Sequence, residues 1–300
     1  MRIDLHTHST ASDGTDTPEQ LVAVAARAGV DVLAITDHDN TLGWEPALAA
    51  LPDHMTLVRG TEFSTKWFTE DGGRISVHLL GYLFDPDDTA LAAERERVRT
   101  SRINRGREIV GRMVEGGLPV TWERVETLAA GGSVGRPHIA RALVEAGVVP
   151  DVGAAFTDLL STESPYYVQE ADMDVAEAVR LIRGAHGIPV LAHAQARKRG
   201  ALIGDAAIVT LAEAGLIGLE VDHPDHEDDD RTHLRGLAAD LGLVTLGSSD
   251  YHGTNKRTPI AACTTSEESY RELVERETAI RPVRGDEVRG GEVPGGSTGS

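Results

Sequence analysis

Short apolar runs alternate with helical patterns over most of the chain, and this alternation limits the folds that are open to it. We predict strands at residues 2–5, 31–36, 55–61, 75–83, 189–192, 217–221 and 244–247. Helical patterns cover residues 18–28, 44–50, 175–186, 205–214, 231–241 and 267–276. Such alternation predicts an α/β fold with a parallel sheet and right-handed crossovers, either doubly wound or closed as a barrel.

One long segment interrupts the alternation. Residues 88–170 show helical patterns throughout, and they carry 10 Arg against 12 acidic residues, a net charge of −2 that leaves −17 for the rest of the chain. We therefore predict a main domain formed by residues 1–87 and 171–280, with residues 88–170 inserted as a helical cap. Residues 281–300 contain six Gly and no Leu or Ile, a composition that predicts a disordered tail.

The charge balance and the single cysteine exclude several classes of protein. A net charge of −19 argues against sequence-independent binding of duplex nucleic acid, which requires a surplus of Lys and Arg. Cys263 has no partner for an internal disulfide, and the sequence shows neither a signal peptide nor an apolar run of membrane-spanning length. We expect a cytoplasmic protein without a membrane segment or an obligate protein partner.

Metal-ligand types recur where the predicted strands end. They are His6, His8, Asp13, His38, Glu62, His78, His193, Asp250 and His252. The carboxyl ends of parallel strands meet at one edge of the sheet, so these side chains are expected to share one face of the fold. A lone His is usually structural, and we place His54, His186 and His233 in that class. In contrast, nine imidazole and carboxylate groups on one predicted edge indicate a multinuclear metal site.

The local spacing supports a site for divalent ions. His6 and His8 lie two residues apart, so a strand directs both imidazoles to the same side. His38 stands between Asp37 and Asp39, whose carboxylates are candidates to orient its ring by accepting the second N–H. Mixed imidazole and carboxylate ligands suit Zn, Mn, Fe or similar ions, and the lack of usable Cys excludes thiolate sites.

Five segments together resemble the PHP (polymerase and histidinol phosphatase) family of metal-dependent phosphoesterases. They are the opening DLHTHSTASDGTDTPEQLVAVAARAGVDVLAITDHDN, then GTEFS, His78, VLAHA and LGSSDYHG. The likeness covers roughly residues 1–265 and is greatest for the stand-alone branch that acts on 3′,5′-nucleoside bisphosphates and short RNA. It implies a distorted barrel of seven β/α units with three metal ions at its C-terminal face, here with the helical cap inserted.

The resemblance also implies a division of the ligands. His6 and His8 would hold the first ion together with Glu62 and Asp250, and Glu62 would bridge to a second ion. His78 and His193 would complete that second ion, whereas the third would be held by Asp13, His38 and His252. Mn²⁺ is the first choice of metal, with Zn²⁺, Fe²⁺ or Mg²⁺ as alternatives.

Several basic residues are candidates for substrate binding. Family members place an arginine of the cap over the metals, which here implies Arg136 in Gly135-Arg136-Pro137-His138, with His138 beside it. Lys66 and Lys256 each follow a ligand position by four residues, and Arg102 belongs to an Arg-rich helical run that also fits a solvated helix face. Relatives often have an aromatic residue where this chain has Asp222.

The expected reaction follows from the resemblance and from the clustered ions. A hydroxide bridging the ions near Glu62 would attack the 3′-phosphate of a 3′,5′-nucleoside bisphosphate, while Arg136 steadies the second phosphate. His193 and His223 are candidates for the general acid. A mononucleotide or the 5′ end of a short single-stranded RNA is the expected substrate. Histidinol-phosphate phosphatase is the alternative within the family, and a non-catalytic metal-binding module is the alternative outside it.

Overall fold

An eight-stranded sheet forms the centre of the computed structural model, which describes residues 1–129, 131–132, 134–169 and 173–289. The strand order is β1-β2-β3-β4-β5-β6-β7, with β8 paired to β3. The strands are β1 (Ile3–Asp4), β2 (Val32–Ile35), β3 (Thr56–Phe68), β4 (Arg74–Tyr82), β5 (Ile188–Leu191), β6 (Gly218–Asp222), β7 (Val244–Gly247) and β8 (Val283–Arg284). A single parallel bridge between Thr7 and Tyr251 links the two ends of this order and nearly closes the barrel.

The sheet is mixed, so the prediction of a parallel sheet is wrong for one strand. β4 runs antiparallel both to β3 and to β5, whereas the other neighbours along the order are parallel. Only residues 69–73 join β3 to β4, and a connection this short permits a hairpin but not the crossover that parallel strands need. Because β3 pairs with β4 in this hairpin, β3 extends to Phe68, beyond its predicted end at residue 61.

Helices cover the outside of the sheet. They are α1 (Pro18–Arg27), α2 (Trp44–Ala49), α7 (Val175–Gly184), α8 (Asp205–Glu213), α9 (Asp228–Leu241), α10 (Glu267–Val274) and α11 (Gly285–Arg289), with short 3-10 turns at Arg197–Arg199 and Gly253–Asn255. In α1, Thr17 and Gln20 form a capping box, and Leu21, Val22 and Ala25 turn inward. This apolar stripe packs on one face of the sheet, and residues such as Val32 and Ala34 on the opposite face form a second core.

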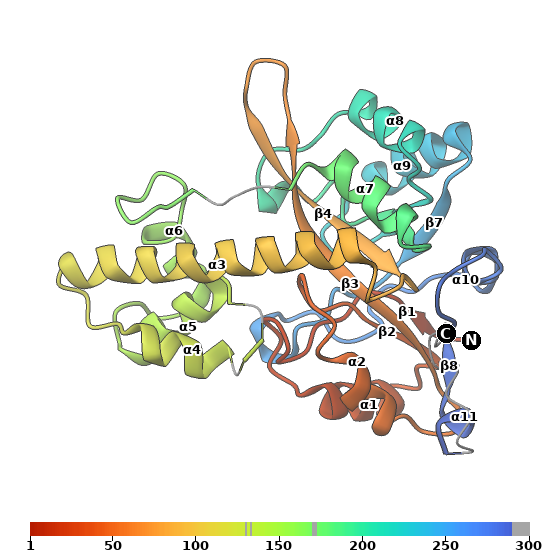
Figure 1. The fold of residues 1–300 in the computed structure, drawn as a ribbon, viewed down its shortest axis with the longest axis horizontal. Coiled ribbons are helices and arrows are strands. Elements are labelled where there is room, and N and C mark those ends of the chain that lie inside the picture. The colour runs from red at the N-terminus through yellow and green to blue at the C-terminus, as the bar shows by residue number, and fades with distance from the viewer. Residues whose placement is uncertain (130, 133, 170–172, 290–300) are drawn as a thin grey trace.

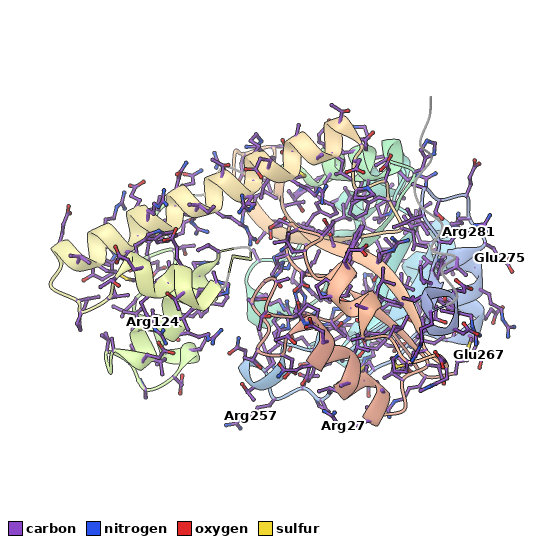
Figure 2. All side chains as sticks on the ribbon, turned by 60° about the horizontal axis from the view of Figure 1, so that its bottom comes forward. Arg27, Arg124, Arg257, Glu267, Glu275 and Arg281 are labelled. Atoms are coloured by element: carbon purple, nitrogen blue, oxygen red, sulfur yellow. The ribbon has the colours of Figure 1, made fainter. Side chains whose placement is uncertain are left out.

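The predicted helical insertion consists of four helices with an apolar core of their own. They are α3 (Thr89–Glu115), α4 (Trp122–Ala129), α5 (Arg136–Glu145) and α6 (Val152–Asp158). Figure 1 shows α3 running from the barrel into this region, where α4, α5 and α6 gather around its far end. Ile109, Met113, Val125, Ile139 and Leu143 are among the side chains of the cap core. Arg124 lies in this cap, well apart from Arg27 on the barrel (Figure 2).

Part of the predicted disordered tail is ordered. Residues 283–289 form β8 and α11, so the expectation of disorder from residue 281 is wrong for this part, and residues 290–300 lie outside the described chain. β4 pairs with β3 only from Gly60 onward, which leaves Thr56 and Leu57 with an open edge. Arg284 and Val283 pair with these two residues, and Val283 is buried. None of the helices among the described residues is long and apolar enough to span a membrane.

Candidate metal centre

The nine predicted ligands lie together at the carboxyl edge of the barrel. Most of them are buried, and His38, Asp13 and His78 are partly exposed on the cavity side. Two of the nine, His193 and Asp250, have left-handed backbone conformations, with φ of 28° and 51°. Non-glycine residues rarely adopt this region, and such strain is concentrated at functional sites.

Five imidazoles surround the carboxylate of Glu62. Its Oε2 lies 3.2 Å from His6 Nε2, 3.0 Å from His8 Nε2 and 3.3 Å from His38 Nδ1. Its Oε1 lies 2.7 Å from His78 Nδ1 and 3.0 Å from His193 Nε2. The two oxygens thus face different histidines, which is the arrangement required of a carboxylate that bridges two ions.

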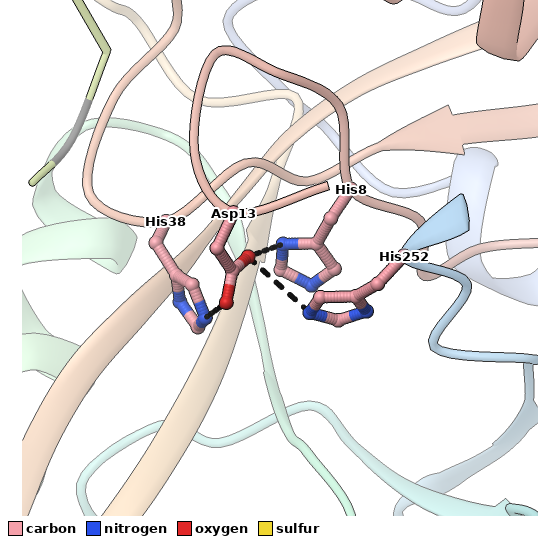
Figure 3. Close-up of side chains that lie close together, drawn as sticks. All are labelled: His8, Asp13, His38 and His252. Atoms are coloured by element: carbon pink, nitrogen blue, oxygen red, sulfur yellow. Dashed lines mark ion pairs between the residues drawn. The ribbon is translucent and has the colours of Figure 1, made fainter. Parts of the chain in front are cut away.

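A second group forms around Asp13 (Figure 3). Its Oδ1 lies 3.3 Å from His252 Nε2 and 3.6 Å from His8 Nδ1, and its Oδ2 lies 3.9 Å from His38 Nε2. His8 and His38 therefore each face Asp13 with one ring nitrogen and Glu62 with the other. The two groups form one continuous cluster.

Three sets of ligand atoms come close enough to hold ions, each set lying within 4.8 Å. The sets are His8, Asp13, His38 and His252; His6, His8, Glu62 and Asp250; and His38, Glu62 and His78. They differ from the implied division because His38 joins Glu62 and His78, whereas His193, 3.0 Å from Glu62 Oε1, belongs to none of the three sets. Arg199 also contacts His193, at 3.0 Å between the guanidinium and Nε2.

The residues present fit divalent cations. Asp250 Oδ1 and His38 Nδ1 are buried and have no hydrogen-bond partner in the described part of the chain, although both point into the cluster. His6 Nε2 and His8 Nε2 face one another at 3.0 Å, which suits two lone pairs directed at a shared ion. Buried polar atoms normally have hydrogen-bond partners, so Asp250 Oδ1 and His38 Nδ1 are candidates to bind a cation.

The pKa values of His193, His252 and Glu62 favour metal binding, but that of His6 does not. Burial lowers the pKa of His6, and Glu62, Glu220 and Asp250 outweigh burial and hold it well above its ordinary value. Burial, reinforced by nearby cations, lowers the pKa of His193 well below its ordinary value and that of His252 to about 4, so both rings are neutral near pH 7. Burial raises the pKa of Glu62, but His78 and the neighbouring imidazoles outweigh burial and hold that pKa well below its usual range. Neutral imidazoles beside an ionised carboxylate are the forms that bind metal.

Glu220, in the middle of β6, contacts two of the candidate ligands. Its Oε1 lies 3.1 Å from His6 Nδ1, and its Oε2 accepts a hydrogen bond of 2.8 Å from the backbone N–H of His193. If His6 donates from Nδ1, its Nε2 is left with a free lone pair toward the cluster. Glu220 is not among the predicted site residues, although an acidic residue between the apolar Leu219 and Val221 in a predicted strand is a usable signal.

The predicted orientation of His38 by its two neighbours is wrong. Asp37 instead accepts hydrogen bonds from the backbone N–H and hydroxyl of Ser9 and from the hydroxyl of Ser12. Asp39 pairs with Arg102 at 3.1 Å. The aspartates therefore position the loop after β1 and the start of the cap, while the ring nitrogens of His38 face Glu62 and Asp13.

One cavity of about 790 Å³ joins the cluster to the cap. All five candidate substrate residues line it: Lys66, Arg102, Arg136, His138 and Lys256. Lys256 pairs with Asp250. Arg136 donates to the Leu160 carbonyl at 3.0 Å and lies over the ring of Phe156.

His138 and Asp222 lie differently from what the sequence suggested. His138 is buried, its Nδ1 accepts from the backbone N–H of Gly135 and its Nε2 donates to the Ser12 carbonyl at 2.8 Å, so it links the cap to the loop that carries Asp13. Asp222 pairs with Arg235, and the described cavity wall does not include it. His54, His186 and His233 are exposed.

Comparisons with known proteins agree with this geometry. The family model for the PHP domain matches residues 4–98. The chain is 34% identical to the 3′,5′-nucleoside bisphosphate phosphatase of Chromobacterium violaceum, over 83% of this chain and 87% of that protein. It is 33% identical to a 5′-3′ exoribonuclease of Haemophilus influenzae, over 84% of this chain and 90% of that protein.

A solved structure supports the same assignment. The structure of a candidate metal-dependent phosphoesterase from Bifidobacterium adolescentis superposes with a TM-score of 0.84 at 34% identity, covering 92% of this chain and 96% of that one. The fold, the clustered ligands and these relatives together show that the chain belongs to the PHP family of metal-dependent phosphoesterases.

Proposed function

We propose that this chain removes the 3′-phosphate from 3′,5′-nucleoside bisphosphates and acts on the 5′ end of short single-stranded RNA. The main observation behind this proposal is one continuous cavity, with the Glu62 and Asp13 clusters on its barrel side and Arg136 on its cap side. One phosphate of a doubly phosphorylated substrate can lie at the clusters while Arg136 contacts the other. The relatives named above, a bisphosphate phosphatase and an exoribonuclease, support this choice.

We assign the nine clustered residues as ligands of three divalent ions, with Mn²⁺ as the first choice. The ligands are His6, His8, Asp13, His38, Glu62, His78, His193, Asp250 and His252. Bound ions would supply Lewis-acid chemistry: they would neutralise phosphate oxygens and make water a stronger nucleophile. Glu62 and Asp13 fix where such ions would lie, because each faces several imidazoles.

His223 is our choice for the general acid. Its Nδ1 accepts a hydrogen bond of 3.0 Å from the backbone N–H of Asp225, so in the neutral ring the proton is on Nε2. Nε2 is buried without a hydrogen-bond partner among the described residues, and His223 lines the cavity. A leaving-group oxygen there could accept a hydrogen bond from Nε2–H. Complete transfer of a proton requires the imidazolium, in which Nδ1 is also protonated and no longer accepts from the Asp225 N–H. His193 is the weaker candidate, because its Nε2 already faces Glu62 Oε1 and Arg199.

Asp222 gives no support to the rival substrate. In the sequence, Asp222 is a candidate acidic partner for the imidazole of histidinol phosphate. In the structure its carboxylate pairs with Arg235, and Asp222 is not part of the described cavity wall. A non-catalytic role fits poorly with ligands that line an open cavity, because structural metal sites are closed by protein ligands.

A substrate panel tests the proposal. Phosphate release with Mn²⁺ would be measured for adenosine 3′,5′-bisphosphate, adenosine 5′-monophosphate and histidinol phosphate. We expect the bisphosphate to be preferred, and Arg136→Ala to raise its KM more than that of the monophosphate. Preference for histidinol phosphate would overturn the substrate assignment, and absence of phosphate release across several metals would favour the binding module.

A further inference from the structure

The cavity extends into the cap, where its wall contains none of the nine candidate metal ligands. Its wall there is formed by Gly106, Ile109, Val134, Val152, Phe156 and Leu160. Apart from Gly106, these residues belong to the apolar core of the cap or pack against it. The cavity therefore extends from buried histidines and carboxylates into an apolar compartment.

The two parts of the cavity differ in their negatively charged side chains. Among the described residues of the wall, every carboxylate comes from the barrel: Asp13, Asp225 and Asp250. The cap contributes arginines and apolar side chains instead. A cationic organic group such as an imidazolium would lose its hydration there without gaining an opposite charge, whereas a neutral flat ring would lose little.

Phe156 gives this compartment an aromatic surface. Its side chain is half-buried, and the Arg136 guanidinium lies 5.5 Å from the ring centroid. Arg136 and Phe156 line the same cavity as the clusters, and the guanidinium lies over the ring, so the two side chains are adjacent on the cap wall. One molecule could therefore contact the ring and place a phosphate against Arg136.

We infer that the cap compartment binds the nucleobase of the substrate, with Phe156 as the stacking surface and Arg136 as the neighbouring phosphate contact. This inference rests on the proposed function and specifies where its selectivity for a nucleotide arises. Aromatic side chains stack on any base, and removing one costs roughly 5- to 150-fold in affinity. The compartment thus selects a base-bearing substrate without selecting one base strongly.

An abasic substrate separates base recognition from phosphate chemistry. The ratio of kcat/KM for adenosine 3′,5′-bisphosphate to that for ribose 3,5-bisphosphate would be measured with Mn²⁺ for wild type, Phe156→Ala and Phe68→Ala. The ratio is internal to each protein sample, so a partly misfolded variant does not distort it. Phe68 is an exposed aromatic on the β3–β4 hairpin and serves as the matched control, because the described cavity wall does not include it.

We expect a wild-type ratio of about 10 or more, a ratio near 1 for Phe156→Ala and a wild-type ratio for Phe68→Ala. In parallel, the fluorescence of 2-aminopurine riboside 3′,5′-bisphosphate would be quenched on binding to wild type and much less on binding to Phe156→Ala. A wild-type ratio near 1, or a ratio that Phe156→Ala leaves unchanged, would overturn the base site alone. Failure of wild type to hydrolyse either bisphosphate would overturn the proposed function, and the inference with it.

Discussion

The barrel edge and the cap line the same cavity, but they are built by opposite means. At the barrel edge, side chains of distant segments are fixed by buried polar contacts, as when Asp4 accepts hydrogen bonds from the Ser249 hydroxyl and the Ala261 N–H at 2.6 and 2.7 Å. In the cap, helices α3 to α6 pack through apolar side chains, and polar groups face the cavity mainly as arginines. The comparison suggests that the barrel positions reacting groups, whereas the cap selects what reaches them.

The cap meets the barrel through a few specific contacts near the ligands. Arg102 pairs with Asp39, next to His38, and His138 donates to the Ser12 carbonyl, next to Asp13. A Cβ at Gly132 would collide with the Ala11 carbonyl, so only glycine permits the close approach of cap and loop. The cap is therefore joined to the segments that carry Asp13 and His38.

Removing a ligand tests the barrel side and has the largest expected effect. His8→Ala and Asp250→Asn should each lower kcat about 1,000-fold or more, because a lost ion forfeits several kcal/mol of transition-state stabilisation. Circular dichroism should show that both variants remain folded. Asp222→Asn is the matched control, since its carboxylate pairs with Arg235 outside the described wall of the cavity. Wild-type turnover by either ligand variant would contradict the assignment.

The second test asks whether the barrel needs its supporting carboxylate. Glu220→Gln keeps the shape but removes the negative charge and replaces one carboxylate oxygen by an NH₂ group. Either His6 Nδ1 or the His193 N–H then loses its acceptor. Loss of such a partner typically costs 10- to 100-fold in metal affinity, and we expect about that loss for Mn²⁺ or Co²⁺ by titration calorimetry. Metal affinity equal to that of wild type would show that Glu220 serves folding only.

The sequence predicted the barrel edge well because its signals are local. The two-residue spacing of His6 and His8, and the position of His38, Glu62 and His193 after apolar runs, can be seen without any tertiary information. The structure brings these residues together as expected. The insertion was equally visible, because a long helical stretch with its own charge balance interrupts the strand pattern.

Apart from the direction of β4, the wrong or missing predictions concern contacts between segments that lie far apart in the chain. Glu220 is 214 residues from His6, and no pattern around either residue announces their pairing. β8 forms because β3 has an open edge at Thr56 and Leu57, which only the completed sheet reveals. Asp37 is adjacent to His38 in sequence, yet it binds Ser9 and Ser12 because the loop after β1 packs against it.

The contact between cap and loop provides a test of intermediate size. His138→Ala leaves the Gly135 N–H and the Ser12 carbonyl without their buried partner, which should lower the free energy of unfolding by about 1–3 kcal/mol. Urea unfolding measures this loss. His233→Ala, at an exposed histidine that pairs with Asp205, is the control and should change stability by less than about 1 kcal/mol. Equal effects of the two substitutions would mean that the cap does not depend on this link.

The smallest expected effect is the pH dependence of that link. Burial lowers the pKa of His138 below its ordinary value of 6.5, against the opposing influence of Asp13. Only the neutral ring can accept from the Gly135 N–H while donating to Ser12. Below pH 6.5 the unfolded chain takes up a proton here more readily than the folded one, so the stability due to His138 is complete above that pH and declines as the pH falls toward the folded pKa.

The difference in unfolding free energy between wild type and His138→Gln isolates this dependence, because the other titrating groups are shared by both proteins. We expect the difference to shrink between about pH 7.5 and about pH 5.5. A constant difference would mean that the folded and unfolded pKa values of His138 are equal, and the link would then contribute through its shape alone. In either case the measurement separates the cap contact from the barrel ligands, because Gln at position 138 leaves all nine of them in place.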